Sequence, residues 1–243
     1  MKTGDATVLV EVLDSGVFID EEKGIVAGLT LDENIDENSP VEIIGDAQWV
    51  PGIDGSGMEF NHTNEYLLLP DSTQLDLTDQ GTVEAWIYPY TTLTAAGIVH
   101  KGVLEDYSDE SYSLQYNQPG QIAFILTNDG GKHTYLISNE ARLSTNQWHH
   151  IVAAWDSDQM YLYFDGYRVQ NTIIWVWGEG QKSQFPDDFG PARDSDGGLM
   201  IGSQPPPDDA SNFRFNGIID TVLLFDRVLD NSEVLEHYTS LVP

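Results

Sequence analysis

The 243-residue sequence predicts an all-β fold in which two antiparallel sheets pack face to face as a sandwich. Short runs rich in β-branched and aromatic residues recur along the chain, and Gly, Pro, Asn and Asp bound them, as in strands joined by turns. Helical periodicity is nearly absent. A dozen or more strands are therefore expected, and that number favours two sheets.

Each predicted strand is a short β-rich run between turn residues. Two of these runs flank Asp165-Gly166, which has the composition of a two-residue hairpin turn. The runs are, in chain order, Val8–Val12, Gly28–Leu31, Gly57–Phe60, Tyr66–Leu69, Thr82–Tyr88, Gly97–His100, Ser111–Tyr116, Gln121–Thr127, Thr134–Ser138, Trp148–Trp155, Met160–Phe164, Tyr167–Asn171, Gly198–Gly202 and Phe213–Phe225.

One helix is predicted, near the C-terminus. Asp230 and Glu233 have the spacing of a capping box, and Val234, Leu235 and Tyr238 supply a short apolar face. This helix is expected to cover one edge of the sandwich.

The chain divides into a short N-terminal part and one main domain. Residues 1–26 are expected to be an extension or an extra strand, and residues 27–243 to form the domain. Residues 178–198 are rich in Gly, Asp and Pro and break the strand rhythm for longer than an ordinary turn does. Long loops of this kind in a sandwich are often functional, and an ordered surface excursion is the alternative.

The composition excludes several classes of function. Forty acidic residues against ten basic ones give a formal charge of −30, so nucleic acids and anionic membrane surfaces are repelled. The absence of cysteine excludes disulfides, Cys-ligated zinc and thiol nucleophiles. No stretch is apolar for long enough to insert into a bilayer, and the first residues lack the pattern of a signal peptide.

Four stretches of the chain resemble the laminin-G-like, concanavalin-A-like jelly-roll family. They occur in the family's order over roughly residues 28–240, so the joint match is specific. The resemblance implies a jelly-roll sandwich with a short C-terminal helix. The stretches are GSGMEFNHTNEYLLLPDSTQLDLTDQGTVEAWIYP (55–89), NQWHHIVAAWD (146–156), MYLYFDGYRV (160–169) and FNGIIDTVLLFDRVLDNSEVLEHY (215–238).

The same resemblance implies a structural calcium ion near the chain ends, as many relatives hold one. Asp220 is the best candidate ligand, with Asp32 and Asn61 as co-ligands, because carboxylate and amide oxygens suit a hard cation. Asn61 stands where the family usually has Asp, which lowers the ligand charge. A purely hydrogen-bonded, structural Asp220 is the alternative.

Two further groups of residues are candidates for ligand binding. A more distant resemblance to pentraxins implies a calcium site at the rim in two acidic loops, although acidic loops are also expected by chance in so acidic a chain. Trp175 and Trp177 share one strand face beside the long loop, where they could stack on a sugar ring. At least one of the two is nevertheless expected to pack in the core. The acidic candidates are Asp106, Asp109, Asp208 and Asp209.

Catalysis has less support from the sequence. Glu84 and Trp86 point to one face of their strand, but no second acid lies two or four residues from Glu84, and glycoside hydrolysis requires a carboxylate pair. His149 and His150 alternate in direction, so one is expected in the core and the other toward solvent.

Three hypotheses about function follow. The leading one is a non-catalytic recognition or adhesion module, extracellular or on the cell surface, which binds a glycan or a cell-surface protein with the help of calcium. The second is a structural subunit, such as the pilin-like globular head of a self-assembling surface filament. The third is a glycan-active enzyme, which the missing carboxylate pair disfavours.

Overall fold

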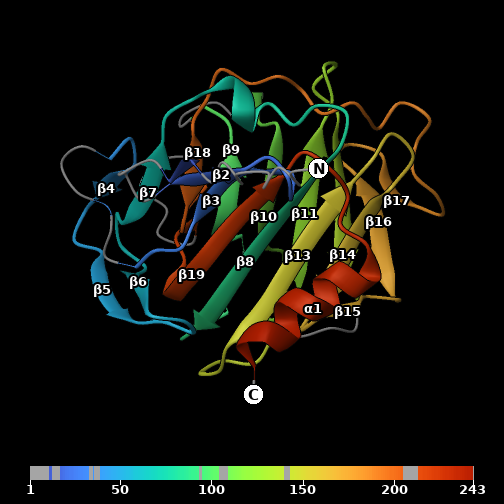
Figure 1. Ribbon diagram of the computed structural model, residues 1–243. Helices are drawn as coiled ribbons and strands as arrows, with labels where there is room; N and C mark the ends of the chain where they lie inside the picture. The colour runs from blue at the N-terminus through green and yellow to red at the C-terminus, as the bar shows by residue number, and fades with distance from the viewer. Residues whose placement is uncertain are drawn as a thin grey trace, which may run out of the picture.

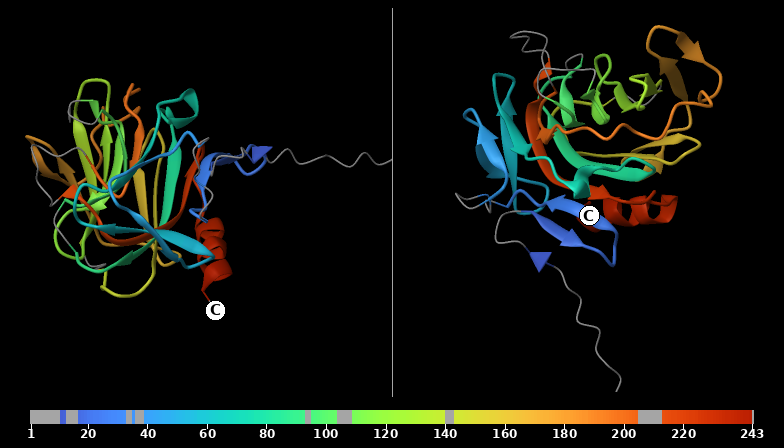
Figure 2. Two further views of the ribbon diagram at one scale, coloured as in Figure 1. Left: turned by 90° about the vertical axis from the view of Figure 1, so that its left-hand side faces the viewer. Right: turned by 90° about the horizontal axis from the view of Figure 1, so that it is seen from above.

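Two antiparallel sheets lie face to face, with one helix outside them (Figures 1 and 2). This arrangement confirms the predicted two-sheet sandwich with a short C-terminal helix. The computed structural model describes residues 11–12, 17–32, 35, 39–92, 95–103, 109–139, 143–204 and 213–242.

The first sheet, here called sheet A, holds ten strands. Eight follow one another by hydrogen bonding, and two more branch off through β19. The eight are β1 (Glu11–Val12), β2 (Phe18–Asp20), β3 (Ile25–Leu29), β19 (Asn216–Phe225), β8 (Gly81–Pro89), β13 (His149–Trp155), β14 (Met160–Phe164) and β15 (Tyr167–Arg168); the two are β6 (Ser56–Asn61) and β5 (Gln48–Pro51).

The second sheet, here called sheet B, holds nine strands. In order across the sheet the strands are β17 (Gly180–Lys182), β16 (Thr172–Val176), β12 (His133–Ser138), β11 (Ile122–Thr127), β10 (Tyr112–Tyr116), β9 (Gly97–Lys101), β18 (Leu199–Ile201), β7 (Tyr66–Leu69) and β4 (Glu42–Ile44). A 3-10 turn, η1 (Thr73–Leu75), lies between β7 and β8 in the chain.

The main hydrophobic core fills the space between the two sheets. Trp155 of sheet A is fully buried there, with ring centroids 5.2 Å from Tyr112 and 5.3 Å from Phe124, both of sheet B. Val83 and Ala85 belong to the same core, whereas Glu84 and Trp86 lie on the opposite face of β8. The predicted alternation along this strand is confirmed.

The N-terminal strands continue sheet A. β2 pairs with β3, and β3 pairs with β19. The residues that precede position 27 therefore include strands that hydrogen-bond into the same sheet as the main domain.

The predicted hairpin turn at Asp165-Gly166 is confirmed. Both residues have positive φ, 49° and 80°, which a two-residue turn of type I′ requires and which glycine adopts without strain. Phe164 and Tyr167 pair directly across this turn.

The predicted capping box of α1 (Asn231–Leu241) is also confirmed. A carboxylate oxygen of Asp230 accepts the backbone N–H of Glu233 at 3.0 Å, and the Glu233 side chain accepts the N–H of Asp230 at 2.8 Å. The helix lies on the outer face of sheet A (Figures 1 and 2), where Val234 packs into a second, smaller core. Among the described residues, no helix is both long and apolar enough to cross a membrane.

Two expectations are corrected. His149 and His150 are both buried, because α1 covers the face toward which His150 points and Asp165 and Ser144 enclose His149. The predicted loop 178–198 contains strand β17, which forms a hairpin with β16.

Candidate ligand-binding groove

The outer face of sheet B carries a mixed row of polar and aromatic side chains. His100, Ser113, Ile125, Tyr135 and Trp175 are successive cross-strand partners on β9, β10, β11, β12 and β16. Several of their neighbours along these strands, including Leu114, Phe124 and Leu136, belong to the core between the sheets, so this row faces away from the core.

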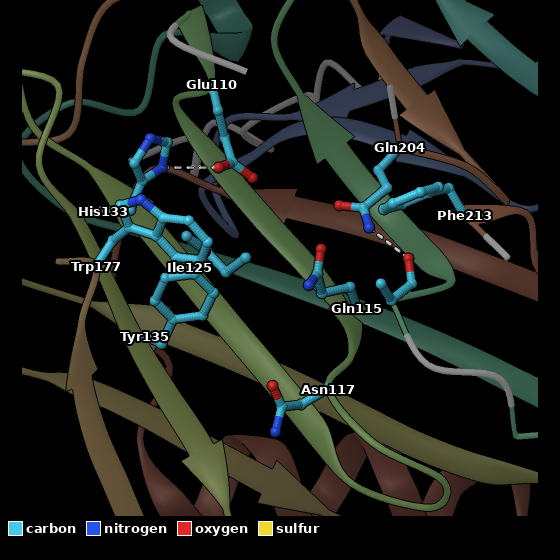
Figure 3. Close-up of a pocket in the computed structure, with 10 residues that line it drawn as sticks. Glu110, Gln115, Asn117, Ile125, His133, Tyr135, Trp177, Gln204 and Phe213 are labelled. Atoms are coloured by element: carbon cyan, nitrogen blue, oxygen red, sulfur yellow. Dashed lines mark hydrogen bonds and ion pairs between the residues drawn. The ribbon is translucent and has the colours of Figure 1, made fainter. Parts of the chain in front are cut away.

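A groove of about 460 Å³ opens on this face (Figure 3). Trp177 and Tyr135 lie on one side of it, Gln204 and Phe213 on the other, and Gln115 between them. The residues that line it are Ala95, Glu110, Gln115, Asn117, Ile125, His133, Tyr135, Trp177, Gln204 and Phe213.

Both tryptophans proposed as a sugar-stacking platform are exposed, which corrects the expectation that at least one packs in the core. Trp177 is 69% exposed and Trp175 is 42% exposed. The N–H of Trp177 donates to the carbonyl of His133 at 3.0 Å, so the backbone holds this residue beside β12. Trp177 lines the groove, and Trp175 lies two residues away on the same face of sheet B.

A buried carboxylate lies at one end of the groove. One Glu110 oxygen is 3.1 Å from Nδ1 of His133, and the other is 3.4 Å from Nδ1 of His100. Burial of Glu110 raises its pKa, but hydrogen bonds and attraction from the two histidines outweigh burial and lower the pKa to about 2. Glu110 is therefore ionised, and it accepts hydrogen bonds without donating them.

Amide side chains supply the other polar groups of the groove. Nε2 of Gln204 donates to the carbonyl of Ala95, which fixes the side chain at the rim. Gln115 is 7% exposed, and its Oε1 has no hydrogen-bond partner in the described part of the chain. A buried acceptor without a donor is costly, so this atom favours a ligand that brings a hydroxyl or N–H group.

Asp109, a predicted ligand-binding residue, joins the segment before β10 to the loop before β18. Its Oδ2 accepts the hydroxyl of Ser195 at 2.8 Å, and its Oδ1 lies 3.2 Å from Nε of Arg193. The other acidic candidates, Asp106, Asp208 and Asp209, lie outside the described residues.

The structure brings two of the three predicted calcium ligands to one turn, between β5 and β6. Oδ2 of Asp220 accepts the N–H groups of Ile53 and Asp54 at 2.8 and 3.2 Å, and Oδ1 of Asp32 accepts the N–H of Ser56 at 3.0 Å. Burial raises the pKa of Asp220 to about 6.

Asn61, the third predicted ligand, lies at the other end of β6. It is five positions from Ser56, which is about 16 Å along a strand. Its side-chain oxygen accepts the hydroxyl of Thr63 at 2.6 Å. The structure therefore does not bring Asn61 to Asp220 and Asp32.

The contacts at this turn fit a hydrogen-bonded anchor better than a three-ligand metal site. Backbone N–H groups, which repel a cation, already occupy both carboxylates. A Cβ at Gly52 would lie 2.3 Å from Oδ2 of Asp220, so the turn depends on glycine to reach the carboxylate. The described residues hold no group of three His, Asp or Glu arranged to bind a metal. Calcium binding stays a prediction.

The sequence comparison agrees with this fold. The sequence model of the concanavalin A-like lectin/glucanases superfamily, of laminin G type, matches residues 61–235, which is more than half of the chain. The chain belongs to this superfamily. A search of curated protein sequences finds no match to this concanavalin A-like chain.

Solved structures similar to this concanavalin A-like chain include binding domains. Domain 4 of a GH43 extracellular arabinanase from Geobacillus stearothermophilus, in complex with arabinotriose, has a TM-score of 0.63 at 18% identity and covers 87% of this chain and 97% of its own. The binding domain of botulinum neurotoxin DC, in complex with rat synaptotagmin II, has a TM-score of 0.63 at 13% identity. The match covers 90% of this chain and 52% of the toxin chain.

A third similar structure is the binding domain of Paraclostridial mosquitocidal protein 1, with a TM-score of 0.60 at 16% identity and coverage of 82% and 47%. The present chain thus spans about half the length of the toxin domains and nearly all of the arabinanase domain. These likenesses, all at low identity, show the fold.

Proposed function

We propose that this domain is a non-catalytic glycan-binding module that holds a sugar chain in the groove on the outer face of sheet B. The observation that carries the proposal is the exposed ring of Trp177 beside a groove whose polar groups are amides, a histidine and a carboxylate. An apolar platform with a few placed polar groups is the usual composition of a small-ligand site.

Trp177 supplies the platform. Its side chain remains 69% exposed in a protein that buries most of its other large aromatic side chains. Tyr135 and Ile125 line the same side of the groove, so a sugar ring placed against Trp177 also meets apolar surface from β11 and β12. Stacking there removes apolar ring area from water on both partners.

The polar groups face the ligand from the floor and the far side. The unpaired Oε1 of Gln115 and the ionised Glu110 accept hydrogen bonds, and sugar hydroxyls can donate them. Asn117 also lines the groove and can both donate and accept. This combination suits a polyhydroxylated ligand better than an apolar one.

A binding role has more support than a catalytic role. Glycoside hydrolysis uses two carboxyl groups that flank the reacting bond. Among the described residues that line the groove, Glu110 is the single carboxylate, and both of its oxygens already contact histidine. The arabinanase domain in complex with arabinotriose is a similar fold with a glycan bound, which adds support for the class of ligand.

The place of action is also a proposal. We propose that the domain works outside the cell, since the arabinanase with the similar domain is extracellular and glycan polymers are found there. A structural calcium ion at Asp220, if bound, lies on the other sheet, so the groove itself requires no metal.

The test compares two exposed aromatic side chains. Trp177→Ala removes the platform, whereas Tyr167→Ala removes a ring that is 67% exposed on β15 of sheet A. Binding of neutral oligosaccharides is measured by glycan array and then by calorimetry. If Trp177→Ala removes about half of a typical aromatic contact area, the binding free energy falls by about 2 kcal/mol. This corresponds to a roughly thirtyfold weaker affinity for the oligosaccharide. Equal affinity of both variants and the natural protein would contradict the proposed site.

A further inference from the structure

We propose that the groove selects uncharged oligosaccharides of several sugar units and rejects glycans that carry carboxylate or sulfate groups. This inference rests on the proposed glycan-binding function and narrows its ligand. It follows from the charges around the groove, from its length, and from the hydrogen-bonding character of its floor.

The groove offers no fixed positive charge to an anionic ligand. Among its described lining residues there is no lysine or arginine, and the negative charge of the ionised Glu110 lies against His100 and His133, which already hold both of its oxygens. Lys132, next to His133 on the chain, is within 3.1 Å of carboxylates of both Glu179 and Asp188. Arg193 is likewise paired with Asp109.

The surroundings add to this repulsion. The whole protein has a formal charge of −30, so a second anion approaches against the field of the surface as well as that of Glu110. Recognition of a carboxylate or sulfate usually relies on arginine or lysine.

The floor of the groove also prefers hydroxyl groups over anions. Oε1 of Gln115 is a buried acceptor without a partner in the described part of the chain, and Glu110 accepts only. A sugar hydroxyl can donate to either group. A carboxylate or sulfate oxygen can only accept, so it would place acceptor against acceptor at both positions.

The length of the groove requires more than one sugar unit. Trp177 follows β16 directly, and Ala95 at the other side precedes β9, so the lining residues span β16, β12, β11, β10 and β9. Four spacings between neighbouring strands add up to about 19 Å. Aromatic rings lie on both sides, Trp177 and Phe213, with amides between them (Figure 3). A chain of several sugar units fills this distance, and a monosaccharide does not.

The experiment is a glycan array that carries neutral, uronic-acid, sialylated and sulfated glycans of one to eight units, probed with the intact protein. Binding is expected only on neutral glycans, with affinity that rises with chain length to at least three units. Calorimetry then compares the best neutral oligosaccharide with its sulfate ester. The ester is expected to bind at least about tenfold more weakly, with a gap that narrows as salt screens the repulsion.

A pair of charge variants sharpens the test. Gln115→Lys places a cation in the middle of the groove and is expected to let the sulfated oligosaccharide bind. Gln48→Lys on β5 of sheet A changes the net charge equally and is expected to leave the discrimination unchanged.

The outcomes separate the two proposals. Binding to acidic glycans that Trp177→Ala abolishes, or monosaccharide affinity equal to that of longer chains, overturns this inference and leaves glycan binding in place. Absence of binding to every glycan on the array overturns the proposed function itself.

Discussion

Substitution Glu84→Gln is expected to weaken the attachment of α1 to sheet A and to lower the free energy of unfolding. Glu84 is 2% exposed, and its two oxygens contact Nε2 of His150 at 2.9 Å and Nδ1 of His237 at 2.8 Å. Burial raises the pKa of Glu84, but the bonds to both histidines outweigh it and lower the pKa from 4.5 to about 2. That difference corresponds to about 3 kcal/mol of stability from the ionised group.

The loss depends on pH in a defined direction. Because the pKa of Glu84 is lower in the folded state, its contribution is fully present above the unfolded value of 4.5 and disappears as pH falls through about 2. Glu84→Gln is therefore expected to cost about 3 kcal/mol at pH 7, and the gap to the natural protein should narrow steadily below pH 4.5.

Urea unfolding, followed by tryptophan fluorescence at pH 7, 4.5 and 3, measures this gap. Glu236→Gln is the matched control, since Glu236 is an exposed glutamate of the same helix. A gap that stays constant from pH 7 to 3, or equal losses for the two variants, would refute the reasoning. Glu84 lies on the sheet opposite the groove, so oligosaccharide affinity should not change.

Three more predictions concern charges elsewhere in the protein. The hydrogen bond to Glu84 raises the pKa of His237, so the contact with the protonated imidazole stabilises the protein fully below pH 6.5 and is lost as pH rises through the higher pKa of the folded state. His237→Ala should therefore lower the free energy of unfolding more at pH 5.5 than at pH 9. A larger loss at pH 9 would be inconsistent with this contact. Burial raises the pKa of Asp220 from 3.8 to about 6, so its ionised form destabilises the folded protein above that range. Without calcium, Asp220→Asn should increase the free energy of unfolding at pH 7 by up to about 3 kcal/mol. Melting curves that coincide with calcium and with chelator would contradict the predicted calcium site. Because forty acidic residues face only ten basic ones, the melting temperature should rise from low to molar salt, and an unchanged value would argue against strong self-repulsion in the folded state.

The local features of the fold could be predicted from the sequence because each depends on a few neighbouring residues. The turn at Asp165-Gly166 requires two residues with positive φ, and the capping box of Asp230 and Glu233 requires one spacing. The face of Glu84 followed from alternation along its strand. Its histidine partners did not, since His150 and His237 lie 66 and 153 residues away in sequence.

The groove could be predicted only in part, because it depends on the register between distant strands. The sequence identifies Trp177 as a candidate sugar platform from its position beside the long loop, but it does not predict that both Trp175 and Trp177 are exposed. Glu110, Gln115 and Gln204 were missed, although β10 and β11 each alternate between core and outer residues. Every residue of these two strands is buried, so the pattern of polar and apolar residues in the sequence does not distinguish the face that lines the groove from the face that packs in the core.

Each sheet carries one buried carboxylate between two histidines, and the two clusters differ in what covers them. Glu84 on sheet A and Glu110 beside sheet B each lie buried between two histidines with a pKa of about 2. On sheet A, α1 closes over the cluster, and one of the two histidines comes from the helix itself. On sheet B both histidines come from strands, and Glu110 and His133 line an open groove bordered by Trp177. The first cluster therefore has its partner within the chain and contributes stability, whereas the second still faces a space that a ligand can fill.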